Sequence, residues 1–216
     1  MKRALYAAGT ALCLLLLLIV ILCAAVTRLG RDGELYTRCF HAFAKDTSRF
    51  GVGTEQYDAN GQDLGDYFSG AEAAFPYFNA RETAHLADIQ ALFRLFDRAW
   101  ALLLPAAVLI FLLAKKPDPK GFLWGLGCAV LLPAGLGVWI ALDFQRAFLL
   151  MHRLLFINRL WLLNPNTDLL ICLMPEPMFT CLAGRLALTV LPAWLLIPTL
   201  VILGRTMLWK KSRCAP

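Results

Sequence analysis

The stretch ALYAAGTALCLLLLLIVILCAAVT, residues 4–27, contains no charged side chain and is long enough to cross a membrane. A helix of about 20 apolar residues spans the hydrocarbon core of a bilayer and satisfies its own backbone hydrogen bonds. Three further apolar runs follow, at residues 99–114, 121–142 and 186–207. We therefore predict an all-α membrane protein with four transmembrane helices.

The composition supports this prediction. Hydrophobic residues make up 59% of the 216 and charged residues 17%, whereas soluble domains have about 45–50% and 25%. The first apolar run directly follows Lys2 and Arg3, as in a signal peptide, but it is longer than a typical signal core. We expect it to remain as an uncleaved span of a single membrane domain, residues 1–216.

Charge is distributed unequally between the connections. With the N-terminus inside, the inner charges lie on Lys2 and Arg3, in the loop 115–120, on Arg205 and in the tail 208–216. They sum to +8, and the outer segments 28–98 and 143–185 sum to −2. Because basic residues are enriched on the cytoplasmic side, we predict cytoplasmic termini and two outer segments that together form a cap. The net charge of +6 then reflects topology, and no nucleic-acid partner is expected.

Each outer segment also has a pattern that predicts a short amphipathic helix. In the first, Leu64, Tyr67 and Phe68 recur at helical spacing after a loop at residues 51–53. In the second, a helix in the headgroup region is indicated by Phe144, Phe148, His152, Leu155 and Arg159. Seven cysteines without a CxxC pair indicate neither a disulfide framework nor a zinc site, and a bridge between Cys172 and Cys181 stays open.

Two of the three histidines have the sequence surroundings of a proton-transfer group. A helix beginning after Asn79 places Glu82, His85 and Asp88 on one side, where either carboxylate can orient the imidazole and stabilise its protonated form. The alternative for Asn79 and Glu82 is a capping box at the start of that helix. His41 has no acidic neighbour at helical spacing and is interpreted as structural.

His152 lies in apolar sequence, where a polar side chain at the membrane boundary usually has a partner and a role. The alternative is a hydrogen bond to a backbone carbonyl. Asp168 follows Asn-Pro-Asn-Thr, and the alternative for it is closure of that turn, because Asn and Asp favour local backbone bonding. A catalytic metal site is a weaker alternative, because the sequence has one Glu-x-x-His motif rather than two and has no HExxH motif. We therefore expect no metal or other cofactor.

These residues carry a resemblance to a family. The motif runs from Phe78 and Asn79 through Arg81, Glu82, His85, Leu86 and Asp88 to Ile89, and continues downstream with His152, Phe156, Trp161, Asp168, Ile171, Pro175 and Glu176. It resembles the bacterial four-span lipoprotein intramolecular transacylases, called Lit. The resemblance covers nearly the whole chain, although Asn158 and Arg159 differ from the small or acidic residues commoner at those positions.

The resemblance implies an enzyme of the bacterial cell membrane that acts on diacylglyceryl-modified lipoproteins in the outer leaflet, among membrane lipids. It transfers the sn-2 acyl chain to the α-amino group of the same N-terminal cysteine, giving the lyso-form. On this basis we expect His85 to remove the ammonium proton and His152 to polarise the carbonyl or protonate the leaving oxygen, or the reverse. The residues expected to support them are Glu82, Asp88, Asn79, Arg81 and Asp168, and those expected to form an apolar wall are Phe156, Trp161, Tyr77 and Phe78.

Two other classes of function remain open from the sequence. One is a non-catalytic module that binds lipid or lipoprotein, with structural or pH-sensing histidines. The other is a lipid acyltransferase or hydrolase with a different acceptor. A transporter is disfavoured because the apolar runs hold almost no polar residues, whereas transport pathways need them near mid-membrane.

Overall fold

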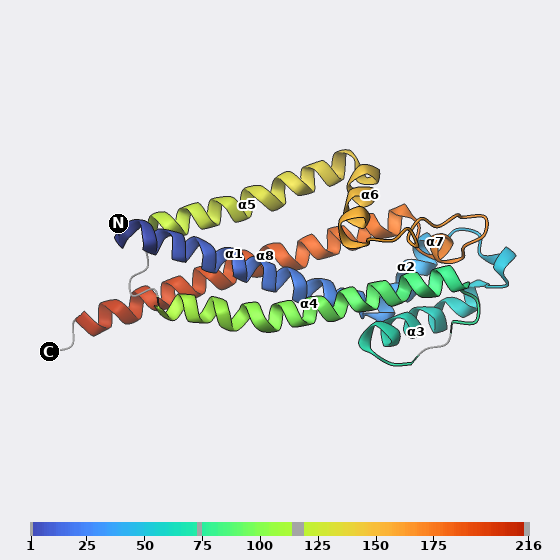
Figure 1. Cartoon of the computed structure of the whole chain (residues 1–216), viewed down its shortest axis with the longest axis horizontal. Helices are drawn as coiled ribbons and strands as arrows, with labels where there is room; N and C mark the ends of the chain where they lie inside the picture. The colour runs from blue at the N-terminus through green and yellow to red at the C-terminus, as the bar shows by residue number, and fades with distance from the viewer. Residues whose placement is uncertain (1, 73–74, 114–118, 214–216) are drawn as a thin grey trace. The chain divides into compact units, whose positions relative to one another are not determined.

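The computed structural model describes residues 2–72, 75–113 and 119–213, and all regular secondary structure among them is helical. The elements are α1 (Lys2–Gly30), α2 (Gly33–Phe43), η1 (Ser48–Phe50), η2 (Thr54–Gln56), α3 (Tyr57–Ser69), α4 (Ala80–Leu113), α5 (Pro119–Leu142), α6 (Phe144–Leu155), α7 (Leu170–Leu173) and α8 (Glu176–Arg213) (Figure 1). Residues 115–118 of the predicted inner loop and residues 214–216 of the predicted tail lie outside the described residues.

Three helical stretches are long and apolar enough to cross a membrane, Ala11–Gly30, Ala80–Leu113 and Glu176–Ile197. A fourth candidate arises if the bent pair Ala134–Leu142 and Phe144–Leu155 is counted as one span. The predicted runs 4–27, 121–142 and 186–207 fall within α1, α5 and α8, and residues 99–113 of the remaining run fall within α4. Residue 114, the last of that run, lies outside the described residues. The structure therefore agrees with the prediction in being all-helical, and it has three to four candidate spans.

Two of the predicted spans belong to much longer helices. Helix α4 begins at Ala80 rather than at residue 99, and α8 begins at Glu176 rather than at residue 186. The 34 residues of α4 extend about 51 Å, whereas the hydrocarbon core is about 30 Å thick. Since six charged residues lie between positions 81 and 98 of α4, we expect only its apolar part from residue 99 onward to cross the membrane.

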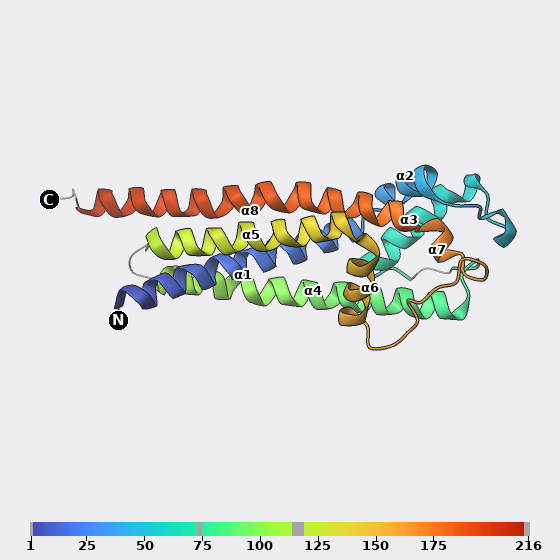
Figure 2. The ribbon, with the colours of Figure 1, turned by 90° about the horizontal axis from the view of Figure 1, so that it is seen from above.

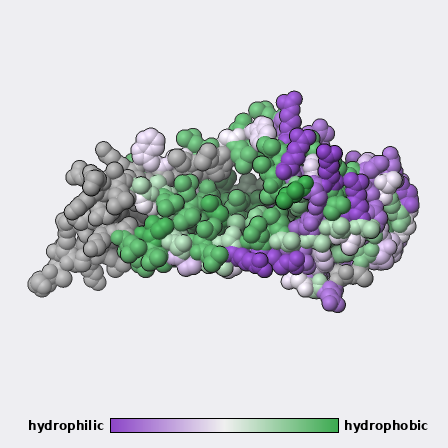
Figure 3. All heavy atoms as spheres, in the orientation of Figure 1, coloured by the Kyte–Doolittle hydropathy of each residue, from purple (hydrophilic) through white to green (hydrophobic). Residues whose placement is uncertain are grey.

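The chain divides into two units, and α1, α4 and α8 contribute to both. Unit 1 comprises residues 1–25, 97–142 and 187–216. Its large apolar side chains are often exposed: Leu102 is 71% and Leu131 73% exposed, while Trp194 is buried. Figure 3 shows apolar residues gathered over these helices. Exposed apolar surface of this extent is what a lipid-facing helix requires.

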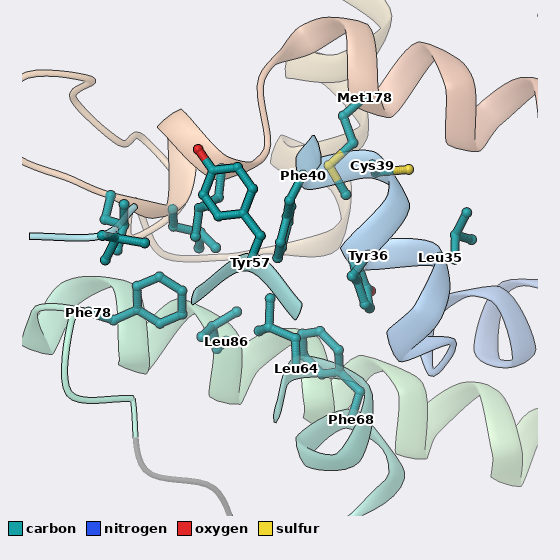
Figure 4. Close-up of a cluster of buried hydrophobic side chains, with 14 of the residues drawn as sticks. Leu35, Tyr36, Cys39, Phe40, Tyr57, Leu64, Phe68, Phe78, Leu86 and Met178 are labelled. Carbon is teal, nitrogen blue, oxygen red and sulfur yellow. The ribbon is translucent and has the colours of Figure 1, made fainter. Parts of the chain in front are cut away.

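Unit 2 comprises residues 26–96 and 143–186 and has a core of its own. Buried apolar side chains from α2, α3, α4, α7 and α8 form this core, among them Leu35, Phe40, Leu64, Leu86, Leu173 and Met178 (Figure 4). The predicted amphipathic helix is α3, with Leu64 and Phe68 buried. Burying a Leu or Phe side chain stabilises a fold by about 1.5–3 kcal/mol, so this core can hold the polar segments in place.

Helix α2 was not predicted from the sequence. Asp32 caps its N-terminus, with the side-chain Oδ1 accepting a hydrogen bond from the backbone N–H of Leu35 at 2.8 Å. Its buried face carries Leu35, Tyr36, Cys39 and Phe40. An N-cap aspartate followed by apolar residues at this spacing is the signal that predicts such a helix.

Helices α2 and α3 pack side by side at unusually close range (Figures 1 and 2). A Cβ on Gly61 would lie 2.6 Å from the backbone nitrogen of Thr37, and one on Gly65 would lie 2.7 Å from the Cα of Gly33. Real Cβ atoms do not approach backbone this closely. The two helices therefore touch through glycine at these positions.

Replacing Gly65 by alanine is expected to lower the stability of unit 2. The added methyl group must push α2 away from α3, and overpacking of this kind costs about 1–3 kcal/mol. Thermal unfolding of the purified protein in detergent measures the effect. Gly137→Ala is the matched control, since a Cβ on Gly137 of α5 meets nothing within 4 Å, and equal melting temperatures for both variants would contradict the close packing.

Helix α6 is shorter than its pattern predicted. It begins after the cap residue Asp143 and ends at Leu155, so Arg159 lies in the following loop and not on the helix. The side chain of Asn158 accepts a hydrogen bond from the backbone N–H of Leu160 at 3.0 Å. Because asparagine offers the backbone such an alternative partner, it favours a turn over a continued helix.

The cysteine pair left open by the sequence is not bonded in the structure. Cys172 and Cys181 are both free. The thiol of Cys172 donates to the carbonyl oxygen of Pro165 at 3.4 Å, while the thiol of Cys181 interacts with that of Cys39, on α2. Cys172 thus joins α7, in which it lies, to the loop that precedes it.

Candidate active site

The structure brings His85 and His152 together within unit 2. His85 lies on the second turn of α4 and His152 in the last turn of α6. Their ring centroids are 6.2 Å apart, and only 4% of His85 and 7% of His152 is exposed. Two titratable rings that are both buried and neighbouring are an arrangement that general acid–base chemistry uses.

One ring nitrogen of His152 has a defined role. Its Nδ1 lies 2.9 Å from the backbone carbonyl oxygen of Phe148, one turn earlier in α6. A carbonyl oxygen can only accept, so this Nδ1 carries the proton and the neutral ring keeps its lone pair on Nε2. The alternative predicted for His152, a hydrogen bond to a backbone carbonyl, is therefore present. It leaves Nε2 as the nitrogen that can accept a proton.

Aromatic rings enclose the pair. Phe156 contacts both histidines, with ring centroids 5.1 Å from His85 and 5.6 Å from His152. Trp161 lies 5.0 Å and Phe148 4.1 Å from His152. Phe156 and Trp161 are two of the four residues predicted to form an apolar wall. Phe148 is an addition, and its position four residues before His152 on an amphipathic helix is the signal for it.

Burial lowers the pKa of both histidines. For His85 burial and then the nearby His152 lower the pKa to about 4, with Asp88 acting in the opposite direction. The pKa of His152 is also lowered by burial, against a raising effect of the hydrogen bond to Phe148. The acidic neighbours of His85 were expected to stabilise its protonated form, but burial outweighs them because few water molecules remain to solvate the charge.

Glu82 does not form the predicted contact with the imidazole of His85, three residues further along α4. Its carboxylate is 1% exposed and accepts two backbone hydrogen bonds, from Asn79 at 2.7 Å and from Leu170 at 2.5 Å. Burial raises its pKa, while these backbone hydrogen bonds act to lower it. The Nδ1 of His85 is buried and has no hydrogen-bond partner among the described atoms. Glu82 thus connects the start of α4 to the start of α7.

Asn79 forms the predicted N-cap and extends the same connection. Its Oδ1 accepts from the backbone N–H of Arg81 at 2.9 Å and of Glu82 at 3.0 Å, which with the Glu82 bond completes the capping box. Its Nδ2 donates to Oδ1 of Asp168 at 2.8 Å. Asp168 also accepts from the N–H of Asn164 at 2.7 Å, so it closes the turn as well. Asn79 therefore acts as the helix cap and Asp168 as the turn residue, and the hydrogen bond between them joins the two.

Two further contacts attach the loop after α6 to α4. Asp88 accepts a hydrogen bond from Nδ2 of Asn158 at 2.8 Å, and the guanidinium of Arg81 donates to the carbonyl oxygen of Arg159 at 3.1 Å. Asp88 and Arg81 were predicted as supporting residues, and here they hold the loop that carries Phe156 and Trp161. Asn158 was marked by the sequence only as a departure from the family pattern.

A hollow of about 510 Å³ adjoins this loop. Its lining combines apolar and basic side chains, namely Leu149, Arg153, Phe156, Ile157, Asn158, Arg159, Trp161 and Leu162. Two of these residues, Phe156 and Trp161, also contact His152. The hollow therefore lies directly beside the histidine pair.

The remaining predicted residues lie elsewhere. Phe78 is buried in the core of unit 2, with its ring against Phe75, and Tyr77 is 41% exposed. Neither has a ring contact with the histidines among those the structure describes. His41 is exposed and lies 2.8 Å from Oδ1 of Asp58, a partner in α3 that helical spacing cannot reveal. In the described part of the chain, no three His, Cys, Asp or Glu side chains gather to hold a metal ion.

Apolar helices fit to cross a membrane, together with a buried pair of histidines in a polar unit, define an integral membrane protein with a candidate acid–base site. The chain belongs to the family described as lipoprotein intramolecular transacylase Lit, whose sequence model matches residues 10–179. As a member of this family it is a membrane acyltransferase. No curated protein matches the sequence.

Solved structures of the lipoprotein intramolecular transacylase Lit from Bacillus cereus share the fold. One is 20% identical, with a TM-score of 0.74 over 99% of this chain and 98% of that chain. Two variants of the same protein, in which a histidine is replaced by arginine or by alanine, are each 21% identical with a TM-score of 0.70. Each alignment covers 99% of this chain, with 95% of the arginine variant and 96% of the alanine variant.

Proposed function

We propose that this enzyme moves the sn-2 acyl chain of a diacylglyceryl lipoprotein to the α-amino group of its N-terminal cysteine, which gives the lyso-form lipoprotein. Family membership supports an intramolecular transacylation of a lipoprotein. The observation that carries the finer assignment is the buried pair of His85 and His152 beside a partly apolar hollow. An amphiphilic substrate fits such a hollow, and its reaction needs proton transfer.

The reaction forms an amide N–C bond and breaks the ester C–O bond at the sn-2 carbon. The amine nitrogen must be neutral to attack the carbonyl carbon, and the proton it loses must end on the departing glyceryl oxygen. A single imidazole can accept the first proton and donate it to the oxygen. No covalent acyl-enzyme is required, because amine and ester belong to one molecule and their proximity supplies effective molarity.

His152 is the better candidate for the base. Its Nδ1–H donates to the carbonyl of Phe148, which fixes the tautomer with a free Nε2 and stabilises the imidazolium that forms. His85, with a pKa lowered to about 4, stays neutral and is suited to donate a hydrogen bond to the ester carbonyl. Of the two assignments that the sequence left open, we therefore favour the one in which His152 is the base and His85 polarises the carbonyl.

Aromatic side chains supply the water exclusion that separates transfer from hydrolysis. Phe156 and Trp161 lie against His152 and line the hollow. Water that reached the ester would compete with the amine for the carbonyl. We further propose that these residues face the outer leaflet, with both termini in the cytoplasm, because the charge distribution favours this orientation.

Mass spectrometry of a lipoprotein's N-terminal peptide tests the reaction. Expression of this protein in a bacterial host without lipoprotein N-acylation should give an N-acylated peptide with a monoacylglyceryl thioether and no change in total acyl mass. A peptide that has lost one acyl chain would instead indicate a hydrolase. An unchanged peptide in the presence of well-expressed protein would refute the proposal.

The pH dependence follows from the lowered histidine pKa values. Both imidazoles must be neutral before the reaction, and unperturbed histidine has a pKa of about 6.5. Since burial lowers the pKa of His152 and lowers that of His85 to about 4, the acid limb of kcat should lie below the ordinary histidine range. Initial rates measured across this range with a synthetic lipopeptide check it, and a midpoint at or above about 6.5 would contradict the burial argument.

A further inference from the structure

Two arginines in the hollow are not used by the proposed reaction. Arg153 lies in the last turn of α6 and Arg159 in the loop that follows, and both line the hollow with Phe156 and Trp161. Within the described ranges, neither guanidinium forms an ion pair or a hydrogen bond. Both side chains are exposed, and two cationic groups that border the same concave surface give it a positive potential that attracts an anion.

Other arginines of the same unit do have partners. Arg38 pairs with Glu34 at 2.9 Å, and Arg146 with Asp143 at 3.1 Å. Arg81 donates to the backbone carbonyl of Arg159. This last contact, with the Asp88–Asn158 hydrogen bond, holds the backbone on which Arg159 sits. The hollow thus presents at least one of its charges from an anchored loop, which is what an anion site requires.

The site's position limits what the anion can be. If the proposed function is correct, the substrate's reacting end lies at the histidine pair, next to Phe156 and Trp161, which also line the hollow. That end is an amine, which two guanidinium groups do not attract. The peptide that continues from the modified cysteine advances about 3.3 Å per residue when extended. A side chain one to three residues after the cysteine can therefore reach Arg153 and Arg159.

We propose that Arg153 and Arg159 bind a carboxylate within the first few residues after the lipid-modified cysteine, so that this enzyme prefers lipoproteins with Asp or Glu there. This specificity rests on the proposed function and extends it to the peptide part of the substrate. Guanidinium and carboxylate form charge-assisted hydrogen bonds that can be bidentate. The bound acid also neutralises charge that would otherwise disfavour the incoming α-ammonium.

Synthetic diacylglyceryl-cysteinyl peptides that carry Asp, Asn or Lys directly after the cysteine test the proposal. With the full-length protein in nanodiscs of neutral lipid, kcat/KM should be about tenfold higher for the Asp than for the Asn peptide, and lowest for the Lys peptide. In Arg153→Gln and Arg159→Gln the advantage should shrink through a higher KM for the Asp peptide, with little change in kcat. Arg159→Glu should favour the Lys peptide.

Arg146→Gln is the matched control, because Arg146 lies on α6 but pairs with Asp143 and does not line the hollow. It should retain the preference for the Asp peptide. Equal kcat/KM for the three peptides would overturn the inference and leave transacylation intact, whereas no acyl transfer with any peptide would contradict the proposed function itself. Equal stimulation of all three peptides by phosphatidylglycerol, lost in Arg153→Gln, would assign the site to a lipid headgroup and also overturn it.

Discussion

Replacing His152 by glutamine is expected to lower kcat about 100- to 10,000-fold, the range that removal of a general acid–base group usually produces. Glutamine has a similar volume and can still donate to the carbonyl of Phe148, but it has no nitrogen that accepts a proton at neutral pH. His85→Gln should also lower kcat, because the glutamine amide does not reproduce the placement of the ring donor. Single-turnover acyl transfer in a synthetic lipopeptide measures both losses.

The third histidine provides the control for these substitutions. His41 lies in the same unit but is exposed and pairs with Asp58, away from the histidine pair. His41→Gln should retain the rate and the acyl specificity of the unmodified enzyme. If His152→Gln and His41→Gln had the same rate, the assignment of His152 as the base would be wrong.

Replacing Glu82 by alanine is expected to have the largest effect on stability. The change leaves the backbone N–H groups of Asn79 and Leu170 without their acceptor, and each buried unsatisfied donor costs about 1–3 kcal/mol. It also empties space around a side chain that is 1% exposed. We expect a total loss of about 2–5 kcal/mol, measured as a lower free energy of unfolding in mild detergent.

A graded series distinguishes this connection from a general effect of charge. Glu82→Gln keeps one acceptor oxygen and should lose less stability than Glu82→Ala. Glu72→Ala removes an exposed carboxylate of the same unit and should change stability by less than about 0.5 kcal/mol. A Glu82→Ala protein as stable as Glu72→Ala would show that the hydrogen bonds to Asn79 and Leu170 contribute little.

The local features of the site were predictable from the sequence. The capping box of Asn79 and Glu82 spans four residues, and the amphipathic spacing of Leu64 and Phe68 in α3 spans one turn of a helix. Phe148 and His152 are likewise one turn apart in α6. In each case the partners lie on one helix, whose geometry fixes their separation, so residue spacing suffices to infer the contact.

Contacts between distant segments were not predictable in the same way. Glu82 is separated from Leu170 by 88 positions. Its spacing of three residues to His85 had instead predicted a contact with that imidazole. The carboxylate accepts backbone N–H groups because a buried donor without an acceptor is costly, and this demand arises only when α7 packs against α4. Phe78 likewise lies in the core of unit 2, with its ring against Phe75, and its position in the sequence does not reveal that burial.

What the sequence by itself determined is an apolar, all-helical membrane protein with histidines confined to its polar segments, because hydropathy and helical period are properties of neighbouring residues. The tertiary structure decided that His85 and His152 face one another and that Phe156 contacts both. It also decided that Arg153 and Arg159 share a hollow without a carboxylate partner in the described chain. These positions depend on where α6 ends and on the hydrogen bonds that join the following loop to α4. Such hydrogen bonds connect distant residues, so the periodicity of the sequence does not predict them.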